Sequence, residues 1–358
     1  MKKILHVIRN ISDGGTEKFM QNIIENTNNE YNHYIISYKK VLESTEFVKK
    51  NNVYLYDLDE KNILKVLIKT YRIIKKEKID IIHCYTHYNS GYVMLIAFLA
   101  GVKKRITHSH RSESTRKKSI LNNIYKFISR LLINIFSNIC LACGEDAAKS
   151  LFYKSKNVTI INNGIELNKY KFDSKKRVSL RKKLNILEND IVLGTIGRLD
   201  YNKNQKFLID IFNELTKKNT NMKLIIIGEG YEKNNLANQT KKLGISDKVL
   251  FLGSRRDVNE LYNIFDIFCL TSFKEGLPFV LIESQANGLS CVVSDTVDKK
   301  SDLDNNIKFI SLNSSKEEWI EEINGILKNK KRKDNTKKII EREYTIEKTI
   351  EKIKKIYN

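Results

Sequence analysis

Short runs of β-branched residues alternate with longer helical patterns along the whole 358-residue chain. KKILHVI and KLIIIG have the length and composition of buried strands, whereas NQKFLIDIFNELTKK repeats its apolar residues at helical spacing. A steady alternation of strand and helix predicts parallel sheets whose two faces are covered by helices. About six such strands fall on either side of residue 170, so we expect an α/β chain of two tandem, doubly wound domains.

The length of the chain also favours two domains, because a single hydrophobic core seldom organises more than about 300 residues. We expect an N-terminal Rossmann-like domain at residues 1–170 and a C-terminal Rossmann-like domain at residues 171–335. The charged helical segment 336–358 follows the second sheet and is a candidate to cross back to the N-terminal domain. In open sheets of this kind ligands bind beyond the carboxyl ends of the strands, so the site is expected in those loops and in a central cleft between the domains.

Cysteine usage and the length of the apolar runs bear on where the protein resides. The five cysteines, of which Cys140 and Cys143 form a lone CxxC, fit neither a disulfide framework nor a zinc site, so reduced thiols are expected. The longest apolar runs are far shorter than the ~20 residues that cross a bilayer, and the first residues read as a strand rather than a signal peptide. We therefore expect a cytoplasmic protein.

The net charge of +22 is concentrated in the first half of the chain. Residues 1–180 hold 32 Lys and Arg against 16 Asp and Glu, whereas the remainder holds 32 against 26. A basic segment precedes the amphipathic stretch 119–136, a pattern typical of proteins that rest on anionic lipid. The stretch can equally be an ordinary helix packed on a sheet, and the lysine excess can reflect the codon usage of an AT-rich genome. The cations concerned are Lys103, Lys104, Arg105, Arg111, Arg116, Lys117, Lys118, Lys126 and Arg130.

Several loops that follow expected strands carry residues suited to an anion. Gly14 and Gly15 stand directly before a helix, where the positive helix end favours negative charge, although a tight turn explains the pair equally well. Arg198 and Lys203 lie in the loop after IVLGTIG, and two cations at the mouth of a sheet fit a diphosphate. The GEG at 228–230 lacks the third glycine of a dinucleotide fingerprint and no P-loop occurs, which disfavours a nicotinamide dehydrogenase or a P-loop enzyme.

The most informative stretch is TSFKEGLPFVLIESQANG, which combines two acids with the only proline of the chain. Gly276 gives the backbone freedom, and Pro278 suits a first helical turn. Glu275 precedes the expected helix and Glu283 lies one turn inside it. Backbone N–H groups at the helix start can bind a phosphate, and the two carboxylates can accept hydrogen bonds from sugar hydroxyls. Phosphate and sugar together indicate a nucleotide-sugar.

These motifs together resemble those of the retaining GT-B glycosyltransferases of family 4, and the likeness covers almost the entire chain. It rests on the E-x7-E stretch, GGTEKF, NNGIE, GRLDYNK and LSCVVSD, which occur in the expected order. RITHSHRSES, NICLACGEDAAKSLF and FISLNSSKEEWIEEI further resemble the branch that builds bacterial capsular polysaccharides and exopolysaccharides. The resemblance implies a GT-B fold and a retaining, metal-independent hexosyltransferase of class EC 2.4.

The resemblance also implies roles for individual donor-binding residues. Glu283 would accept hydrogen bonds from the ribose of the donor, and Glu275 would contact hydroxyls of the transferred sugar. The two cations would neutralise the diphosphate, and Gly15 would face it from the first domain. The implied donor-binding residues are Gly15, Arg198, Lys203, Glu275, Gly276, Leu277, Pro278 and Glu283.

Members of the family keep a histidine near the donor sugar, at the end of the strand that corresponds to RITHSH. Here this is His110, with His108 as a rival, because alternation along a strand puts both imidazoles on one face. Either histidine can instead be a buried structural residue. The acidic residue often found beside this histidine is replaced by Arg111. The implied catalytic residues are His110, Glu275, Arg198 and Lys203, with no metal ligand.

The resulting prediction is transfer of a sugar, with UDP as the expected nucleotide, to a lipid-linked oligosaccharide or polysaccharide in bacterial capsule, exopolysaccharide or O-antigen synthesis. No cofactor is expected beyond the nucleotide-sugar donor. The basic first domain is expected to hold the enzyme on the anionic inner leaflet of the plasma membrane, without a nucleic-acid partner. A sugar-nucleotide epimerase of similar fold is the main alternative, and a basic nucleic-acid-binding protein is a further one.

Overall fold

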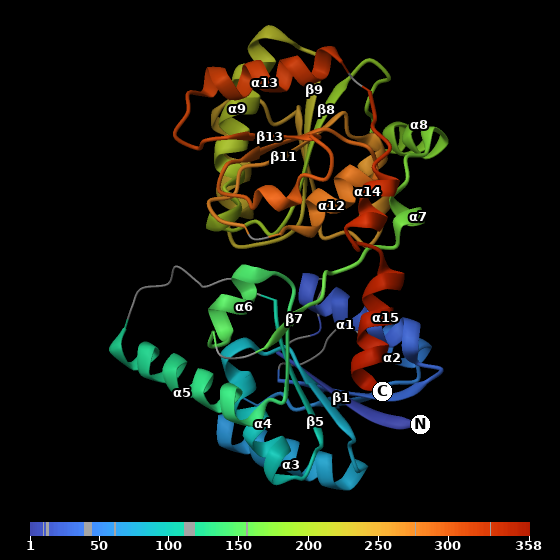
Figure 1. The fold of residues 1–358 in the computed structure, drawn as a ribbon. Helices are drawn as coiled ribbons and strands as arrows, with labels where there is room; N and C mark the ends of the chain where they lie inside the picture. Colours follow the sequence, from blue (N-terminus) through green and yellow to red (C-terminus); the bar gives the residue numbers. More distant parts are fainter. Residues whose placement is uncertain are drawn as a thin grey trace. The chain divides into compact units, whose positions relative to one another are not determined.

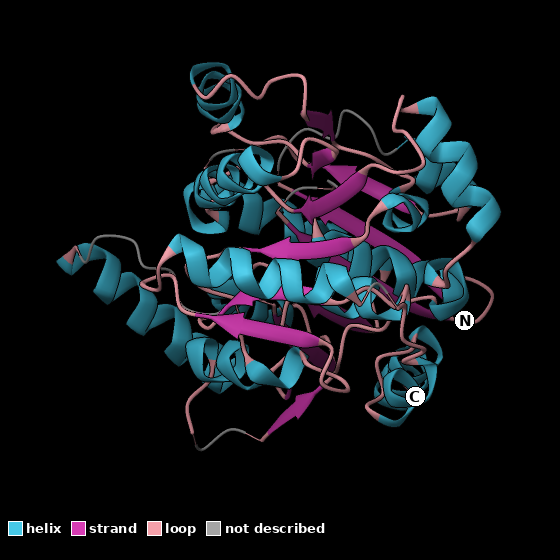
Figure 2. Cartoon of the chain, turned by 90° about the horizontal axis from the view of Figure 1, so that it is seen from above, coloured by secondary structure: helices cyan, strands magenta, loops and turns pink. Residues whose placement is uncertain are grey.

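The computed structural model describes residues 1–358 apart from 10, 12–13, 39–44, 61, 111–118, 155–156, 276 and 330. The described residues form two compact units, the first made of Met1–Gly164 with Ile346–Asn358 and the second of Ile165–Thr345. In each unit parallel strands form a central layer that helices cover (Figures 1 and 2). No helix among the described residues combines the length and the apolar character that a bilayer span requires.

The first unit contains a seven-stranded parallel sheet in the order β3-β2-β1-β4-β5-β6-β7. The order reverses between β1 and β4, and in doubly wound sheets ligands bind beside such a reversal. The strands are β1 (Lys2–Ile8), β2 (Tyr31–Ser37), β3 (Tyr54–Asp57), β4 (Ile81–Cys84), β5 (Lys104–Ser109), β6 (Ile139–Ala142) and β7 (Val158–Ile160). The helices are α1 (Gly15–Thr27), α2 (Thr45–Lys50), α3 (Ile63–Glu77), η1 (His87–Asn89), α4 (Ser90–Leu99), α5 (Ile120–Phe136), α6 (Glu145–Leu151) and α15 (Ile346–Tyr357).

The second unit contains a six-stranded parallel sheet in the order β10-β9-β8-β11-β12-β13, which reverses between β8 and β11. The strands are β8 (Ile191–Ile196), β9 (Met222–Ile227), β10 (Val249–Gly253), β11 (Ile267–Leu270), β12 (Cys291–Ser294) and β13 (Ile307–Ile310). The helices are α7 (Leu167–Tyr170), α8 (Ser174–Lys183), η2 (Tyr201–Lys203), α9 (Gln205–Lys218), α10 (Lys233–Lys242), α11 (Val258–Leu261), η3 (Tyr262–Ile264), α12 (Phe279–Ala286), η4 (Lys299–Ser301), α13 (Lys316–Lys328) and α14 (Thr336–Glu341).

Each sheet is buried on both faces, as its β-branched strands predict. In the first sheet, α1 and α15 share one apolar cluster with the strands, and the other face forms a second cluster with α3 and α4. The second sheet has the same arrangement, with α9 and α13 on one face and α12 on the other. The predicted α/β class with two doubly wound parallel sheets is confirmed.

The C-terminal segment divides between the two units. α14 belongs to the second unit, whereas α15 lies beside α1 on the first sheet (Figure 1). Lys2 and Lys104 donate hydrogen bonds to carbonyls at the C-terminal end of α15, where the helix dipole favours cations. The stretch 336–358, treated above as one segment, is therefore two helices in different units. The buried residues of α15 fall on one helical face and are Ile346, Thr349, Ile350, Ile353 and Tyr357.

Candidate functional site

The second unit joins two loops at the carboxyl ends of its strands. The loop after β8 contains both predicted cations, and the loop after β11 contains Glu275, so the two flank the reversal of the sheet. The carbonyl of Asn202 accepts a hydrogen bond from the backbone N–H of Phe273 at 2.8 Å. The Asn202 side-chain amide donates to the carbonyl of Lys274 at 2.9 Å. These two hydrogen bonds hold the loop after β8 against the loop after β11.

Lys203 and Glu275 meet between these loops. The Nζ atom of Lys203 lies 2.5 Å from Oε1 of Glu275, and the two side chains are only 19% and 14% exposed. Gly197 leaves room for the lysine stem, since a Cβ atom at that position would lie 3.3 Å from Cε of Lys203. An ammonium group has three donors, so Lys203 can hold Glu275 and a ligand oxygen at the same time.

Arg198 lies in the same loop but faces solvent. Its side chain is 72% exposed, and Nε lies 3.4 Å from Oδ2 of Asp200. Asp200 also accepts a hydrogen bond from the backbone N–H of Lys203, which caps η2. Exposed ion pairs contribute little free energy, so the guanidinium can exchange Asp200 for a ligand at small cost.

Two glycines of the GEG sequence bring the loop after β9 against the loop after β8. A Cβ atom on Gly228 would lie 2.0 Å from the carbonyl oxygen of Gly197, and one on Gly230 would lie 2.1 Å from the carbonyl oxygen of Leu199. Gly228 also has a φ of +138°, which L side chains rarely adopt. These glycines therefore serve close backbone packing beneath the cations, in agreement with the sequence argument against a dinucleotide fingerprint.

The helix α12 starts beyond the β11 loop with an uncapped N-terminus. Pro278 is its N-cap residue, with φ −75° and ψ 125°, and no side-chain capping hydrogen bond is found there among the described residues. The sequence pattern predicts Pro278 in the first helical turn. Its extended ψ instead puts it immediately before the helix, because an N-cap residue is not helical. Pro278 is buried and Leu277 is half-buried, while the predicted residue Gly276 lies outside the described residues.

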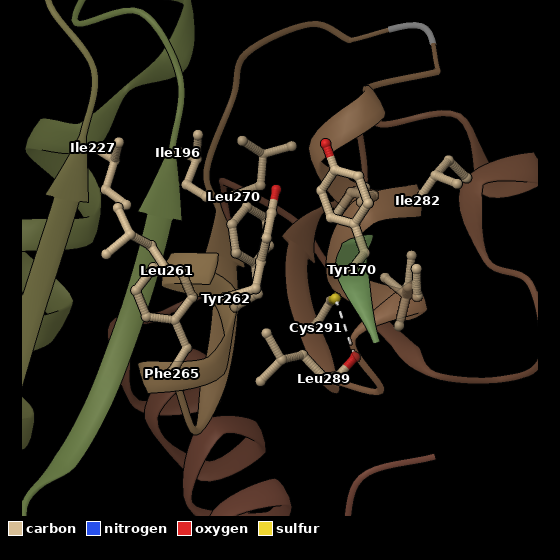
Figure 3. Close-up of a cluster of buried hydrophobic side chains, with 14 of the residues drawn as sticks. Tyr170, Ile196, Ile227, Leu261, Tyr262, Phe265, Leu270, Ile282, Leu289 and Cys291 are labelled. Carbon is tan, nitrogen blue, oxygen red and sulfur yellow. Dashed lines mark hydrogen bonds between the residues drawn. The ribbon is translucent and has the colours of Figure 1, made fainter. Parts of the chain in front are cut away.

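Glu283 is buried inside the second unit. Its Oε1 accepts a hydrogen bond from the hydroxyl of Tyr170 at 2.7 Å, and its Oε2 accepts one from Tyr262 at 2.8 Å. The two tyrosines point their hydroxyl groups in the same direction from one apolar cluster (Figure 3). Burial first, and the nearby carboxylate second, raise the pKa of both phenols, so both remain donors. The sequence offers no sign of these partners, since Tyr170 precedes Glu283 by 113 positions.

In the first unit, Gly15 is the first residue of α1, which begins beyond β1 at the reversal of the sheet. The N-cap residue is Gly14, which has no side chain to cap the helix, and the carboxylate of Glu17 in the first turn lies beside it. Gly15 is exposed. Ser12 and Asp13 of the same motif lie outside the described residues.

His110 and His108 lie at the carboxyl end of β5, near α1. Their ring centroids are 4.1 Å apart, and Phe19 of α1 has its ring 4.9 Å from each of them. His108 is fully buried, whereas His110 is half-buried. The structure therefore brings both candidate histidines to one place, with His110 the more accessible of the two. Arg111 lies outside the described residues.

The two histidines lie at the end of a row of buried histidines that the sequence pattern does not reveal. His6, His33 and His83 line the same face of the sheet, and His6 pairs directly with His83 across β1 and β4. Burial lowers the pKa of His33 to about 4 and lowers the pKa of His6, His83 and His108 well below the usual value. These histidines are therefore neutral at neutral pH. Their only sequence signal is a histidine inside each of several strand-like runs.

The structure supports neither a reactive cysteine pair nor a metal site. Cys140 is buried, and burial raises the pKa of Cys143 to about 11, so its thiol stays protonated. In the part of the chain that the structure describes, no group of three or more His, Cys, Asp or Glu side chains is arranged to hold a metal ion.

Two family models match this chain. Residues 14–169 match the model described as Glycosyltransferase Family 4, and residues 176–343 match the model described as Glycosyl transferases group 1. Together the two matches span most of the chain. The chain belongs to the family 4 glycosyltransferases. It is therefore a retaining glycosyltransferase that uses a nucleotide-sugar, which favours the transferase prediction over the epimerase.

Known proteins similar to this family 4 glycosyltransferase agree with its fold and family. CapH of Staphylococcus aureus, a capsular polysaccharide biosynthesis glycosyltransferase, is 26% identical over 320 residues, which are 86% of this chain and 85% of CapH. A UDP-Gal:α-D-GlcNAc-diphosphoundecaprenol α-1,3-galactosyltransferase of Escherichia coli is 29% identical over 240 residues, 65% of this chain and 62% of that protein. The crystal structure of Anabaena HepE with UDP-glucose superposes with a TM-score of 0.82 at 19% identity and covers 99% of both chains. The GT-B fold is thus confirmed.

The glycine packing beneath the cations makes a prediction about stability. In this family 4 glycosyltransferase, Gly228→Ala should lower the free energy of unfolding by about 2 kcal/mol or more, because the new methyl group meets a carbonyl oxygen at a strained φ. A melting temperature lower by about 4–8 °C should follow, measured by circular dichroism. The matched control is Gly325→Ala in α13, where a Cβ atom meets nothing within 4 Å and should stabilise the helix slightly. Equal melting temperatures for the two variants would contradict the packing role.

Proposed function

We propose that this enzyme transfers a hexose from a UDP-sugar to a lipid-linked saccharide, at the cytoplasmic face of the membrane, in the synthesis of a bacterial capsule, exopolysaccharide or O-antigen. The observation that carries the proposal is the half-buried pair of Lys203 and Glu275 beside the uncapped start of α12. Positive charge, the backbone N–H groups of a helix start and a carboxylate then lie at the edge of one sheet, as a diphosphate joined to a sugar requires.

The donor diphosphate would be bound by Lys203, Arg198 and the N-terminus of α12. Lys203 is prepositioned by Glu275, whereas Arg198 is exposed and would close on the phosphates when they arrive. The helix end supplies roughly half a positive charge through its unsatisfied N–H groups. The backbone of Gly276, Leu277 and Pro278, which leads into this helix, would run along the sugar and the phosphates.

Glu275 and Glu283 would bind the two sugars of the donor. Glu283 would accept hydrogen bonds from the ribose beside those from the hydroxyls of Tyr170 and Tyr262. Those hydroxyls also fix the orientation of the Glu283 carboxylate, which lowers the entropic cost of binding. Glu275 would accept hydrogen bonds from hydroxyls of the transferred hexose while Lys203 holds it in place.

In the first unit, Gly15 and His110 are the residues that would contact the donor. Gly15 is exposed at the start of α1, where the positive end of the helix dipole favours an anion. His110 is half-buried and at the carboxyl end of β5, so its imidazole would hydrogen-bond the transferred sugar. Its neighbour His108 is buried beneath it and would act through it.

The reaction would proceed on one face of the sugar ring, as retention requires. The bond between the anomeric carbon and the diphosphate oxygen breaks, and the bond to the acceptor oxygen forms on the same face. The acceptor hydroxyl gives its proton to the departing phosphate oxygen. Lys203, Arg198 and the start of α12 would stabilise the negative charge that develops on the diphosphate.

The similar proteins support this choice of donor and acceptor. The relative from Escherichia coli is named for a UDP-galactose donor and a diphosphoundecaprenol-linked acceptor, and CapH is named for capsular polysaccharide biosynthesis. HepE, which shares the fold, was crystallised with UDP-glucose.

We further propose that α5 docks on an anionic membrane. Only Ser129 and Ile133 of this helix are buried, and its apolar stripe faces solvent instead of the core. Two of its exposed residues, Ile120 and Leu121, are 80% and 78% exposed. The exposed apolar residues of the helix are Ile120, Leu121, Ile124, Phe127, Ile128, Leu131 and Ile135.

The cations near α5 fall into two groups. Lys126 and Arg130 stand over aromatic rings beside a cavity of about 230 Å³ that Phe127 also lines, so they flank the apolar stripe. Lys104 and Arg105 instead donate to carbonyls at the ends of α15 and α5, which is a structural role. The basic residues of 111–118 lie outside the described residues. Lys126 and Arg130 are thus the described cations beside the apolar stripe, where they can meet lipid phosphates, although Arg130 also donates to the carbonyl of Phe152 at the end of α6.

The transferase proposal predicts a specific loss of activity in Glu275→Gln. The variant keeps the size of the side chain but removes a charged hydrogen-bond acceptor, so sugar transfer should fall by about 10- to 100-fold. The assay supplies radiolabelled UDP-hexoses with a synthetic polyprenyl-diphosphate-linked sugar and measures label in the lipid fraction.

The matched control for this assay is Glu229→Gln, which removes an exposed acid paired with Lys233 in the neighbouring loop. It should transfer sugar like the wild type, and both variants should keep the wild-type circular dichroism spectrum. Full transfer by Glu275→Gln would refute the site. Release of only free or isomerised sugar, with no labelled lipid, would refute the reaction.

The membrane proposal predicts that Ile124→Glu and Phe127→Glu, combined, weaken binding to phosphatidylglycerol-containing vesicles by about tenfold or more, because each substitution removes an apolar side chain from the lipid. Vesicle flotation measures the bound fraction. Val178→Glu is the control, since Val178 is 68% exposed on α8 of the second unit and should not affect binding. Equal binding of the variant, or equal binding of the wild type to neutral vesicles, would contradict the proposal.

A further inference from the structure

The buried histidines of the first unit form a hydrogen-bonded chain with a defined direction. It begins at Thr27, whose hydroxyl donates to the carbonyl of Ile23 at 2.6 Å. A hydroxyl has one proton, so Thr27 Oγ1 must accept its second hydrogen bond, from Nε2 of His33 at 3.0 Å. His33 is neutral and carries one ring proton, which leaves its Nδ1 as an acceptor.

The proton positions on His6 and Tyr85 follow from that of His33. Nε2 of His6 lies 3.0 Å from Nδ1 of His33 and must therefore carry a proton. Nδ1 of His6 is then an acceptor, and its partner at 3.2 Å is the hydroxyl of Tyr85. Tyr85 has one hydroxyl proton, and the chain directs it to His6.

The hydroxyl of Tyr85 also determines which ring nitrogen of His83 carries the proton. Nδ1 of His83 lies 3.0 Å from the hydroxyl oxygen of Tyr85 and 2.7 Å from that of Tyr357. Because Tyr85 donates its proton to His6, an unprotonated Nδ1 of His83 would face a lone pair of Tyr85, and the two lone pairs would repel each other. A protonated Nδ1 can donate to both phenol oxygens, and the Tyr357 hydroxyl then donates to Tyr85, with which it is hydrogen-bonded. His83 therefore carries its proton on Nδ1.

The chain ends at His108. Nε2 of His83 is now an acceptor and lies 3.2 Å from Nδ1 of His108, which must carry the proton. Nε2 of His108 is left with a lone pair. This atom is fully buried, and no hydrogen-bond partner for it occurs among the described residues.

We propose that Tyr85 is a positioning residue that, through His83, holds His108 in the Nδ1–H tautomer and so presents an acceptor lone pair beside His110. The rings of His110 and His108 are in contact, with their centroids 4.1 Å apart. Where a neutral His110 donates its one N–H to this acceptor, its other ring nitrogen accepts a hydrogen bond from a hydroxyl of the donor sugar. The catalytic consequence rests on the proposed contact between His110 and that sugar.

The test is the tautomeric state of each histidine, read from two-bond ¹H–¹⁵N spectra of protein labelled at histidine nitrogens. The chain has six histidines, so the spectrum is small enough to assign with single His→Asn variants. At pH 7.5 the wild type should show Nε2–H for His6 and His33, and Nδ1–H for His83 and His108. An Nε2–H tautomer for His108 in the wild type overturns the proposal, and no variant is needed for that result.

Two Tyr→Phe substitutions, each of which removes one hydroxyl group, distinguish a positioning role of Tyr85 from a packing role. In Tyr85→Phe the constraint is lost, so Tyr357 can donate to Nδ1 of His83, and both His83 and His108 should change to Nε2–H. Tyr357→Phe leaves the Tyr85 contact in place and should not change either tautomer, although Tyr357 is the closer of the two to His83. A purely structural role predicts similar effects of both deletions and would overturn the proposal.

Sugar transfer provides the second readout. Tyr85→Phe should lose about tenfold of its activity, and Tyr357→Phe should stay near the wild type. Changed tautomers with unchanged transfer would overturn the effect on His110. Full transfer by His110→Ala would instead remove the proposed role of His110 and leave the tautomer result standing, so the two failures are distinguishable.

Discussion

The ion pair of Lys203 and Glu275 joins the two loops on which the second unit's site depends. Both side chains are largely buried, so removing their charges from water costs free energy that their attraction only partly offsets. Such a pair is a weak source of stability, but it holds an ammonium group and a carboxylate at fixed positions where the strand order reverses. Close glycine packing beneath one loop and the start of α12 beyond the other supply the rigid frame around it.

The fold and the outline of the site could be predicted from the sequence because both depend on local patterns. Strand-like and helical runs alternate, and the parallel sheets follow from that alternation. Arg198, Lys203 and Glu275 could be located because each lies in a loop directly after a strand. Contacts between distant parts of the chain could not be predicted in this way. The tyrosines on Glu283 come from segments with no motif of their own, and the N-cap position of Pro278 depends on its ψ.

The role of the basic residues, like the contacts between distant segments, could not be predicted from the sequence. Net charge suggested a membrane surface but also fitted codon usage, and the structure assigns Lys104 and Arg105 to helix ends. The informative quantity is the exposure of the apolar side chains of α5, which composition does not reveal. The histidine row is similar. Single histidines in separate strands look unremarkable, and only the strand order β2-β1-β4-β5 brings them into hydrogen-bond contact.

Calorimetric titration of UDP into the intact enzyme tests the central claim most directly, because it needs neither the sugar nor the acceptor. The wild type should bind UDP, and Lys203→Met should bind it about 10- to 100-fold more weakly because a charged hydrogen bond to phosphate is lost. Lys233→Met, which removes an exposed lysine from the nearby start of α10, should bind like the wild type. Equal affinity of Lys203→Met and the wild type would show that the nucleotide does not bind at this pair of loops.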